Sequence, residues 1–231
     1  MDEAMQYRSP LAARNASPEM QAIWSERRRF LTWRKLWIAL AEAEKELGLP
    51  ITDEQISQMR EAMETLDLDR AAEHERRVSH DVMAHIHTFA EVAPAARPII
   101  HLGATSQFVG CNTDMTLIRD ALRLVAAKLA RAINALGNLA LRYRDQPTLA
   151  YTHYQPAQPT TVGKRVSLWA HDMSLCLEEV EHRIEALRFR GAKGATGTQA
   201  SFLDLFDGDH EKVETLDRLV AEKMEWDPEK L

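Results

Sequence analysis

Two long rows of apolar residues at helical spacing constrain this chain more than any other feature. The first row lies within a helix predicted at about 112–145 and comprises Ile118, Leu122, Val125, Leu129, Ala132, Leu136 and Leu139. The second lies within about 162–190 and comprises Val166, Trp169, Met173, Cys176, Val180, Ile184 and Leu187. Steps of three and four residues keep each row on one helix face, and such faces pack helices nearly parallel. The sequence therefore predicts two long helices that face each other as the start of an antiparallel bundle.

The composition supports an all-α fold. Hydrophobic residues make up 45% of the 231 residues, aromatic residues only 6%, and Gly and Pro contribute 9 each, a balance that favours helix. We expect an N-terminal helical domain at 1–110 and a partial central helical-bundle domain at 111–231, without the C-terminal remainder of the bundle. Two helices of this length need more partners than the remaining residues supply. Other subunits should cover them, or the chain should be the N-terminal portion of a longer one, or both.

Charge and cysteine usage narrow the class of protein. The net charge of −6, with a pI near 5.9, argues against a generic nucleic-acid-binding protein. Cys111 and Cys176 are far apart in helical context, so reduced thiols are expected rather than a disulfide. No apolar run approaches the length that crosses a bilayer, and residues 1–4 are acidic and lack a signal-peptide pattern. We therefore expect a cytoplasmic protein that does not bind membranes.

Start and stop signals predict the remaining helices. Ser17 and Pro18 begin a helix that should run to about Leu47, with Gly48 as its stop. Further helices are expected from a capping box at Thr52–Gln55, at 67–78, from Ser79–Asp81 to about Glu91, and from Asp207 or Asp209 to about Glu225.

Three polar stretches separate the long helices, at 99–113, 152–165 and 191–201. Pro156 and Pro159 prevent the second from being helical at its start, because proline lacks the amide proton of a helix interior. Each stretch has an ordinary structural interpretation as a helix connector or a satisfied turn. The alternative is that all three meet in one site, since binding and catalytic residues often lie on loops held by rigid elements.

A histidine-rich segment, His80, Asp81, His85 and His87, offers too few ligands for a metal. His80 and His87 share one helix face, whereas Asp81 and His85 share another. A zinc site needs three or four converging ligands, and neither face supplies them. The segment is predicted to be either an ordinary helix cap or a helix start that faces an anion.

Taken together, the polar stretches resemble the fumarase/aspartase superfamily, whose members are α-helical homotetrameric lyases, and within it the adenylosuccinate lyase family of purine biosynthesis. The similarity covers essentially the whole chain. The matching segments are Tyr7–Leu11, His80–His85, His101–Ser106, Thr152–His153, Gln155–Gln158, Lys193–Gly194 and Thr196–Ser201.

The resemblance implies β-elimination of fumarate from adenylosuccinate, giving AMP, and from the succinylated carboxamide ribotide SAICAR, giving AICAR. It implies that His153 is the general acid that protonates the leaving nitrogen, a role that suits an imidazole. The implied partner is a small-molecule substrate, a succinylated purine nucleotide or its precursor, without nucleic acid or membrane. No metal or organic cofactor is implied, and the full-length form is expected to be a homotetramer.

The resemblance also implies a set of substrate-binding residues. Thr105 and Ser106 match residues that hold the succinyl carboxylate, and Arg14 matches an arginine that binds the nucleotide portion, for which a guanidinium is suited. The other implied substrate-binding positions are Asn15, Ser79, His80, Asp81, Gln155 and Lys193. Three positions depart from the family pattern: Asn15 replaces a tyrosine, Ser79 an arginine and Cys111 an aspartate.

The general base implied by the resemblance is a serine on a mobile loop with the pattern Ser-Ser-x-Met-Pro-x-Lys-x-Asn. No such stretch occurs in the 231 residues, and the family builds each active site from several subunits. We therefore expect these residues alone to be inactive. The alternatives are a related lyase, such as an argininosuccinate lyase, and a non-catalytic helical interaction module.

Overall fold

The computed structural model describes residues 9–231, so Tyr7 and Arg8 of the N-terminal motif lie outside the described residues. The chain forms two compact units, one from Met1–Ile118 with Arg188–Leu231 and the other from Arg119–Leu187. The domain boundary near residue 110 stays a prediction, because compactness within one chain does not test where a family's domains divide.

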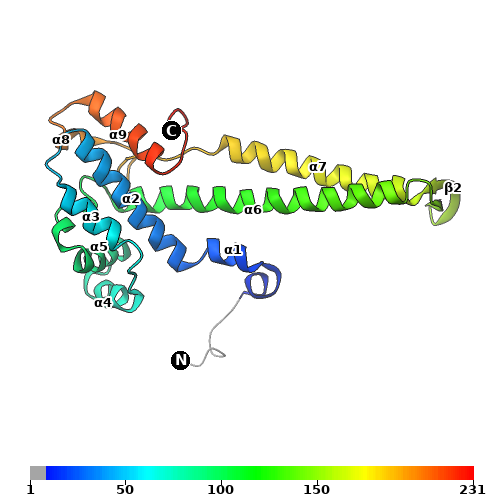
Figure 1. The fold of residues 1–231 in the computed structure, drawn as a ribbon, viewed down its shortest axis with the longest axis horizontal. Coiled ribbons are helices and arrows are strands. Elements are labelled where there is room, and N and C mark those ends of the chain that lie inside the picture. Colours follow the sequence, from blue (N-terminus) through cyan, green and yellow to red (C-terminus); the bar gives the residue numbers. More distant parts are fainter. Residues whose placement is uncertain (1–8) are drawn as a thin grey trace. The chain divides into compact units, whose positions relative to one another are not determined.

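The first unit consists of helices (Figure 1). Its described elements are η2 (Leu11–Asn15), α1 (Pro18–Ile23), α2 (Glu26–Glu46), α3 (Asp53–Glu61), α4 (Leu68–Val78), α5 (Asp81–Val92), η3 (Pro94–Ala96), the start of α6 (Ser106–Arg142), α8 (Ala200–Leu205) and α9 (His210–Lys223). The all-α prediction is confirmed in that the described chain is mostly helical.

Local capping signals account for most of these helix starts. Thr52 and Gln55 form the predicted capping box at α3, and Asp209 caps α9. The single helix predicted from Pro18 to Leu47 is wrong, because the chain breaks at Trp24–Ser25. The Ser25 hydroxyl accepts a hydrogen bond from the Arg28 amide at 3.2 Å and starts α2 afresh, since a serine at this position competes with the continuing helix for backbone hydrogen bonds.

The core of the first unit is organised around α2. Trp33, Leu36, Trp37 and Leu40 are each at most 1% exposed, and α3 and α9 pack on this helix. Burying aromatic and leucine side chains of this size contributes about 1.5–3 kcal/mol each. The core therefore holds α2 as the scaffold for the loops that follow.

One buried cation lies beside this core. The Arg34 guanidinium donates through Nη1 to the carbonyls of Ala62 (2.6 Å), Met63 (3.2 Å) and Thr65 (2.8 Å). It also lies 4.4 Å from the ring centroid of Phe89. Burial lowers the pKa of Arg34 to about 10, which leaves it charged at neutral pH. Arg34 thus satisfies the carbonyl of Ala62 at the C-terminal end of α3 and two carbonyls of the turn that follows.

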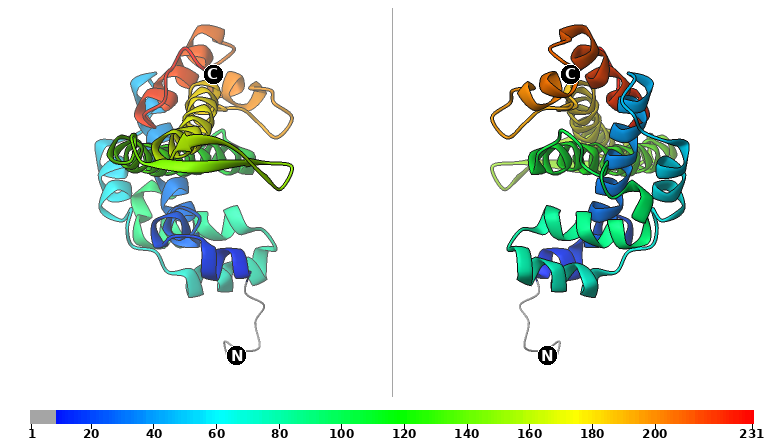
Figure 2. Two further views of the ribbon diagram at one scale, coloured as in Figure 1. Left: turned by 90° about the vertical axis from the view of Figure 1, so that its right-hand side faces the viewer. Right: turned by 90° about the vertical axis from the view of Figure 1, so that its left-hand side faces the viewer.

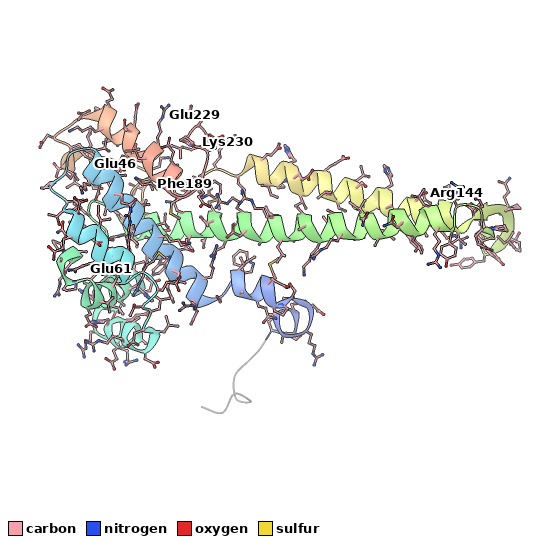
Figure 3. The ribbon with its side chains drawn as sticks, in the orientation of Figure 1. Glu46, Glu61, Arg144, Phe189, Glu229 and Lys230 are labelled. Carbon is pink, nitrogen blue, oxygen red and sulfur yellow. The ribbon has the colours of Figure 1, made fainter. Side chains whose placement is uncertain are left out.

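The segment 188–231 packs into the same unit at Phe189. This ring is 1% exposed and lies 5.6 Å from that of Trp226. The Phe189 amide donates to the Lys230 carbonyl at 3.3 Å (Figure 3). These contacts anchor the chain where it leaves the second unit.

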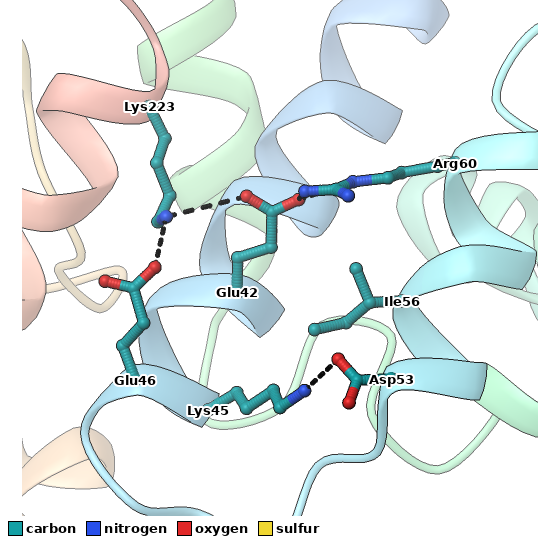
Figure 4. Close-up of a pocket in the computed structure, with 7 residues that line it drawn as sticks. All are labelled: Glu42, Lys45, Glu46, Asp53, Ile56, Arg60 and Lys223. Atoms are coloured by element: carbon teal, nitrogen blue, oxygen red, sulfur yellow. Dashed lines mark hydrogen bonds and ion pairs between the residues drawn. The ribbon is translucent and has the colours of Figure 1, made fainter.

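A shallow charged pocket lies between α2, α3 and α9 (Figure 4). Lys223 bonds Glu46 at 2.6 Å and lies 3.6 Å from Glu42. Arg60 pairs with Glu42 at 2.6 Å, and Lys45 pairs with Asp53. Because each charged side chain that lines the pocket has an ion-pair partner, the pocket offers a ligand no uncompensated charge. Its role is to link the surfaces of three helices.

The second unit contains α6 from residue 119 onward, the hairpin strands β1 (Pro147–Thr152) and β2 (Gln155–Thr161), and α7 (Val162–Ala186). The strands form an antiparallel hairpin (Figure 2). Thr152 lies opposite Gln155, and the register shifts between Leu149 and Tyr151. The prediction of a loop at 152–165 is wrong, because most of the stretch is strand or helix. Pro156 and Pro159 are tolerated because a two-stranded ribbon has only edge strands.

Within the second unit, α7 runs antiparallel to α6 (Figure 1). A Cβ added at Gly163 would lie 2.4 Å from the Ala140 carbonyl oxygen and 2.6 Å from the Arg144 Cα atom, so the two helices meet most closely beside the hairpin. The predicted apolar row on α7 is partly wrong. Trp169 and Met173 are 52% and 38% exposed, whereas the less exposed face follows Val166, Ala170, Ser174, Leu177, Val180, Ile184 and Leu187.

The long helix α6 begins earlier than predicted. It starts at Ser106 and ends at Arg142, so the polar stretch 99–113 is half helix. In the described part of the chain, α6 is the one helix that is long and apolar enough to cross a membrane by length and composition alone, with a mean hydropathy of 1.3 over 18 residues. The expectation that no apolar run approaches this length is therefore wrong, because the Ala- and Leu-rich row was judged as an amphipathic face.

Candidate functional site

The start of α6 is the part of the first unit best suited to bind an anion. The Thr105 carbonyl accepts from the Phe108 amide at 2.9 Å and opens the helix, so the amides of the first two helical residues, Ser106 and Gln107, are left without intrahelical partners. The Thr105 hydroxyl is buried and has no hydrogen-bond partner among the described residues. Ser106 is the first helical residue. A helix N-terminus with two hydroxyls is a good carboxylate site.

The segment 191–201 is held against this helix start. The Ser201 hydroxyl donates to the Gly103 carbonyl at 2.6 Å. A Cβ at Gly194 would lie 3.8 Å from the Thr105 methyl group. Two of the three polar stretches therefore lie together in one unit. The two predicted apolar rows gave no indication that the stretches 99–113 and 191–201 would meet. The contact arises because residues 188–231 pack back into the first unit.

Two buried polar residues hold the 191–201 segment, and sequence reasoning missed both as site residues. The Asn112 side chain donates to the Gly191 carbonyl at 3.0 Å and accepts from the Arg190 amide at 2.9 Å. The Asp217 carboxyl accepts from the Ala192 amide and from the Gln199 side chain. Burial raises the pKa of Asp217, although these donors oppose the shift. Asn112 and Asp217 therefore position the loop.

Lys193 is directed toward the same carboxyl. Its Nζ lies 3.7 Å from Asp217 Oδ2, and the side chain is 38% exposed. The pairing leaves the ammonium group partly accessible to a ligand. Lys193 thus remains a substrate-binding candidate, held at the rim of the segment.

His80 and Asp81 stand at the start of α5. The His80 Nδ1 accepts a 3.5 Å hydrogen bond from the Met83 amide, and the Asp81 carboxylate accepts from the Val82 amide at 2.7 Å. Both side chains are exposed. Ser79 precedes them with a left-handed backbone, φ 52°, which ends α4. The chain reversal at Ser79 therefore presents His80 at an exposed helix start.

His153 lies in the second unit, at the turn between β1 and β2. His153 and Tyr154 both have positive φ, 49° and 62°, which is the pattern of a two-residue turn matched to strand twist. Both side chains are exposed, and so is Gln155. Residues other than glycine rarely adopt this backbone, and such strain is often found at functional positions. The His153 imidazole is therefore presented to solvent at the surface of this unit.

Arg14 and Asn15 lie at the end of η2, and both are exposed.

Among residues 9–231, no group of three or more His, Cys, Asp or Glu side chains could hold a metal ion. His85 stacks on Phe30 at 3.7 Å, and burial followed by the Arg34 charge lowers its pKa to about 4. His85 is therefore a neutral core histidine.

Comparison with known families shows what this architecture belongs to. A family profile described as Lyase matches residues 12–204, which covers the second unit, most of the first and each of the three polar stretches. The chain belongs to this lyase family. The match includes Arg14, His80, Thr105, His153 and Lys193 within one profile.

Comparison with individual relatives gives a more specific resemblance than the family profile does. It is 51% identical to an adenylosuccinate lyase of Schistosoma mansoni and 53% identical to one of Saccharomyces cerevisiae, in each case over 224 residues and 96% of the chain. These alignments cover 47% and 46% of the two relatives. The chain thus spans about half the length of the curated relatives it matches.

Solved structures of two other enzymes share the fold. A 3-carboxy-cis,cis-muconate lactonizing enzyme from Pseudomonas putida aligns with a TM-score of 0.78 at 25% identity, over 94% of this chain and 49% of the other. A fumarate lyase from Mesorhizobium sp. BNC1 aligns with a TM-score of 0.75 at 24% identity, over 91% and 48%. The resemblance stated from the sequence is confirmed at the level of family and fold.

His101 is a further candidate in the lyase chain that the motif contained but sequence reasoning did not single out. Its Nδ1 accepts a 2.8 Å hydrogen bond from the Trp37 indole N–H. Burial, followed by the nearby His80 charge, lowers the pKa of His101 to about 4. Its φ of 69° is left-handed. No spacing rule in the sequence links residues 37 and 101, because their contact depends on the tertiary fold.

Proposed function

We propose that the protein is an adenylosuccinate lyase, which eliminates fumarate from adenylosuccinate to give AMP and from SAICAR to give AICAR. The observation that carries this proposal is the identity of 51–53% over 96% of the chain with relatives described as adenylosuccinate lyases. The meeting of two of the three polar stretches, 99–113 and 191–201, in the first unit supports it. The wider lyase family alone would leave the substrate open.

The start of α6 is proposed to bind a carboxylate of the succinyl group. Thr105 supplies a buried hydroxyl without a described partner, and the first-turn amides supply donors with partial positive charge. Ser106 adds a second hydroxyl. Since a buried donor left unpaired costs about 1–3 kcal/mol, a bound carboxylate would relieve that cost. The unpaired Thr105 hydroxyl therefore favours a ligand that carries a carboxylate over one that does not.

His153 is proposed as the general acid. In the elimination, a base removes a proton from the succinyl carbon, the carbon–nitrogen bond breaks, and His153 gives a proton to the departing nitrogen. The turn projects the imidazole from the second unit, so the groups that enclose the substrate around it must come from outside this unit. We propose that neighbouring subunits of a homotetramer supply them, with His80, Asp81, Gln155 and Lys193 contacting the substrate.

The nucleotide end is proposed to lie near Arg14. This exposed guanidinium suits a phosphate because it can donate two parallel hydrogen bonds. Asn15 and Ser79 stand where the family pattern has tyrosine and arginine, so they should contact the substrate more weakly. Substrate affinity below that of a typical family member is expected.

We also propose that α6 packs against helices of other subunits rather than lipid. Arg119, Arg123, Lys128 and Arg131 recur along its length, and charges at membrane depth are costly.

The two cysteines, Cys111 and Cys176, are free and exposed, which suits the reducing cytoplasm.

Ultraviolet absorbance during incubation with adenylosuccinate tests the activity. The native protein should release fumarate from adenylosuccinate and leave argininosuccinate intact. Cleavage of argininosuccinate instead would favour the related lyase, and cleavage of neither would favour a non-catalytic helical module. The 231 residues expressed alone are proposed to release none, because they lack the serine-loop pattern.

A further inference from the structure

The contact between Trp37 and His101 joins a core helix to the motif at the start of α6. Trp37 lies on α2 and is 1% exposed. Its indole N–H donates to His101 Nδ1 at 2.8 Å, and the two rings are perpendicular, with centroids 5.9 Å apart. An indole nitrogen can only donate. His101 Nδ1 must therefore carry no proton, and the proton of the neutral ring lies on Nε2.

The backbone of the motif holds the ring in this place. His101 is left-handed at φ 69°, a conformation that is unfavourable for a residue other than glycine. Two residues later, Gly103 has φ 64°, and a Cβ there would lie 2.4 Å from the Leu205 side chain. Ser201 donates to the Gly103 carbonyl. Contacts from both sides thus stabilise an otherwise unfavourable loop.

The remaining polar hydrogen of His101, on Nε2, has no acceptor among the described residues. After burial, the second cause of the lowered His101 pKa is the electrostatic effect of His80, at the start of α5. His101 also precedes Thr105, whose hydroxyl is likewise unpartnered. Two donors without described acceptors therefore flank one short motif, which is what a ligand rich in oxygen acceptors requires.

Core packing alone does not explain the indole of Trp37. Trp33 and Phe89 lie in the same aromatic cluster, with ring centroids 6.2 Å and 6.1 Å from Trp37. The Trp33 N–H is buried and has no described acceptor. A phenyl ring could replace most of the packing of either tryptophan. Of the two indoles of Trp37 and Trp33, only that of Trp37 has an acceptor for its N–H, and that acceptor is His101.

We propose that Trp37 is a positioning residue that locks His101 as the neutral Nε2–H tautomer, so that this N–H serves as a fixed hydrogen-bond donor to an oxygen of the substrate. The proposal rests on the proposed function for its substrate, but the lock itself does not. A ring free to exchange tautomers would present the donor only part of the time.

The matched pair Trp37→Phe and Trp33→Phe tests the lock in the native protein. Both variants remove one indole from the same cluster, but only the first removes a donor from His101. Hydrogen–deuterium exchange at histidine C2, read by mass spectrometry, reports the proton affinity of each histidine. That of His101 should rise about tenfold in Trp37→Phe, because Nδ1 becomes available, and should stay unchanged in Trp33→Phe. An unchanged His101 in Trp37→Phe would overturn the lock.

Kinetics test the positioning role. Trp37→Phe should lower kcat for adenylosuccinate about tenfold, the effect of losing one hydrogen bond in the transition state, with Trp33→Phe near the wild type. Equal losses in both variants, or no loss in Trp37→Phe, would overturn the role. Failure of the wild type to cleave adenylosuccinate would instead refute the proposed function, and the exchange experiment would still decide the lock.

Discussion

At the scale of single residues, the first unit contains ionisable side chains whose burial changes their chemistry. Glu44, on α2, is 0% exposed, and neither carboxyl oxygen has a hydrogen-bond partner among the described residues. Burial raises its pKa to about 9. The carboxyl is therefore protonated at neutral pH, and α2 carries it as a neutral group in the core.

Glu44→Gln should stabilise the protein increasingly as pH rises. The folded pKa of about 9 lies above the ordinary value of 4.5. The wild type therefore has its full stability below pH 4.5 and loses it as pH rises toward 9, by up to about 1.4 kcal/mol per pH unit. Glutamine does not titrate, so urea unfolding at pH 5, 7 and 8.5 should show a widening difference in unfolding free energy.

Glu46→Gln is the matched control for Glu44. It lies on the same helix and pairs with Lys223 at the surface, where a single ion pair contributes about 0–1 kcal/mol. A pH-independent difference between Glu44→Gln and the wild type would mean that the Glu44 carboxyl is solvated or paired in solution.

Arg34→Met should destabilise the first unit by about 3 kcal/mol or more. Methionine keeps an apolar stem but leaves the carbonyls of Ala62, Met63 and Thr65 without their donor, and buried unpaired groups are costly. Chemical denaturation measures the change. Arg27→Met, which breaks the exposed pair with Glu64, should change stability by no more than about 0.5 kcal/mol; similar losses in both would contradict the account.

At the scale of elements, helix starts are predictable because their signals are local. Thr52 and Gln55 contain the whole capping box within four positions. The break at Ser25 escaped prediction because the same residue type is tolerated inside helices. The hairpin was not predicted because Pro156 and Pro159 argue against a helix but do not indicate a strand. The face of α7 was misjudged because Trp169 and Met173 fit a helical row equally well whether or not their partner lies in the same chain.

Two glycines on the helices of the second unit should respond in opposite ways to alanine. At Gly163 the added Cβ would meet backbone atoms of Ala140 in α6 and of Arg144 just after it at 2.4–2.7 Å, so Gly163→Ala should lower stability by about 2 kcal/mol or more. At Gly137 the Cβ would meet nothing within 4 Å, so Gly137→Ala should raise stability by about 0.4–1 kcal/mol. Thermal unfolding by circular dichroism measures both, and destabilisation of equal size would argue against the close approach.

At the scale of the whole molecule, the proposed site residues are divided between the two units. Thr105, Ser106 and Lys193 belong to the first unit, and His153 to the second. The sequence indicated these residues through the family resemblance, since no spacing along the chain relates them. Their supports, Asn112, Asp217 and Trp37, could not be predicted, because each acts through a tertiary contact with a residue at least 25 positions away.

His153→Ala in the native protein should lower the rate of fumarate release by about 10²–10⁴-fold, the usual contribution of a positioned acid. The imidazole is exposed at a turn, so its loss should leave the fold intact. Circular dichroism provides that control. Turnover near the wild-type rate would remove His153 from the role of general acid.

Mixing two inactive variants tests the central claim most directly. His153→Ala alters the second unit, and His80→Asn alters the first while keeping a good helix cap. If each site takes these two residues from different chains, subunits of the two variants that are dissociated and reassociated together should form some sites with both residues intact. The account predicts that the mixture releases fumarate from adenylosuccinate well above either variant alone. A mixture no more active than its components would contradict it.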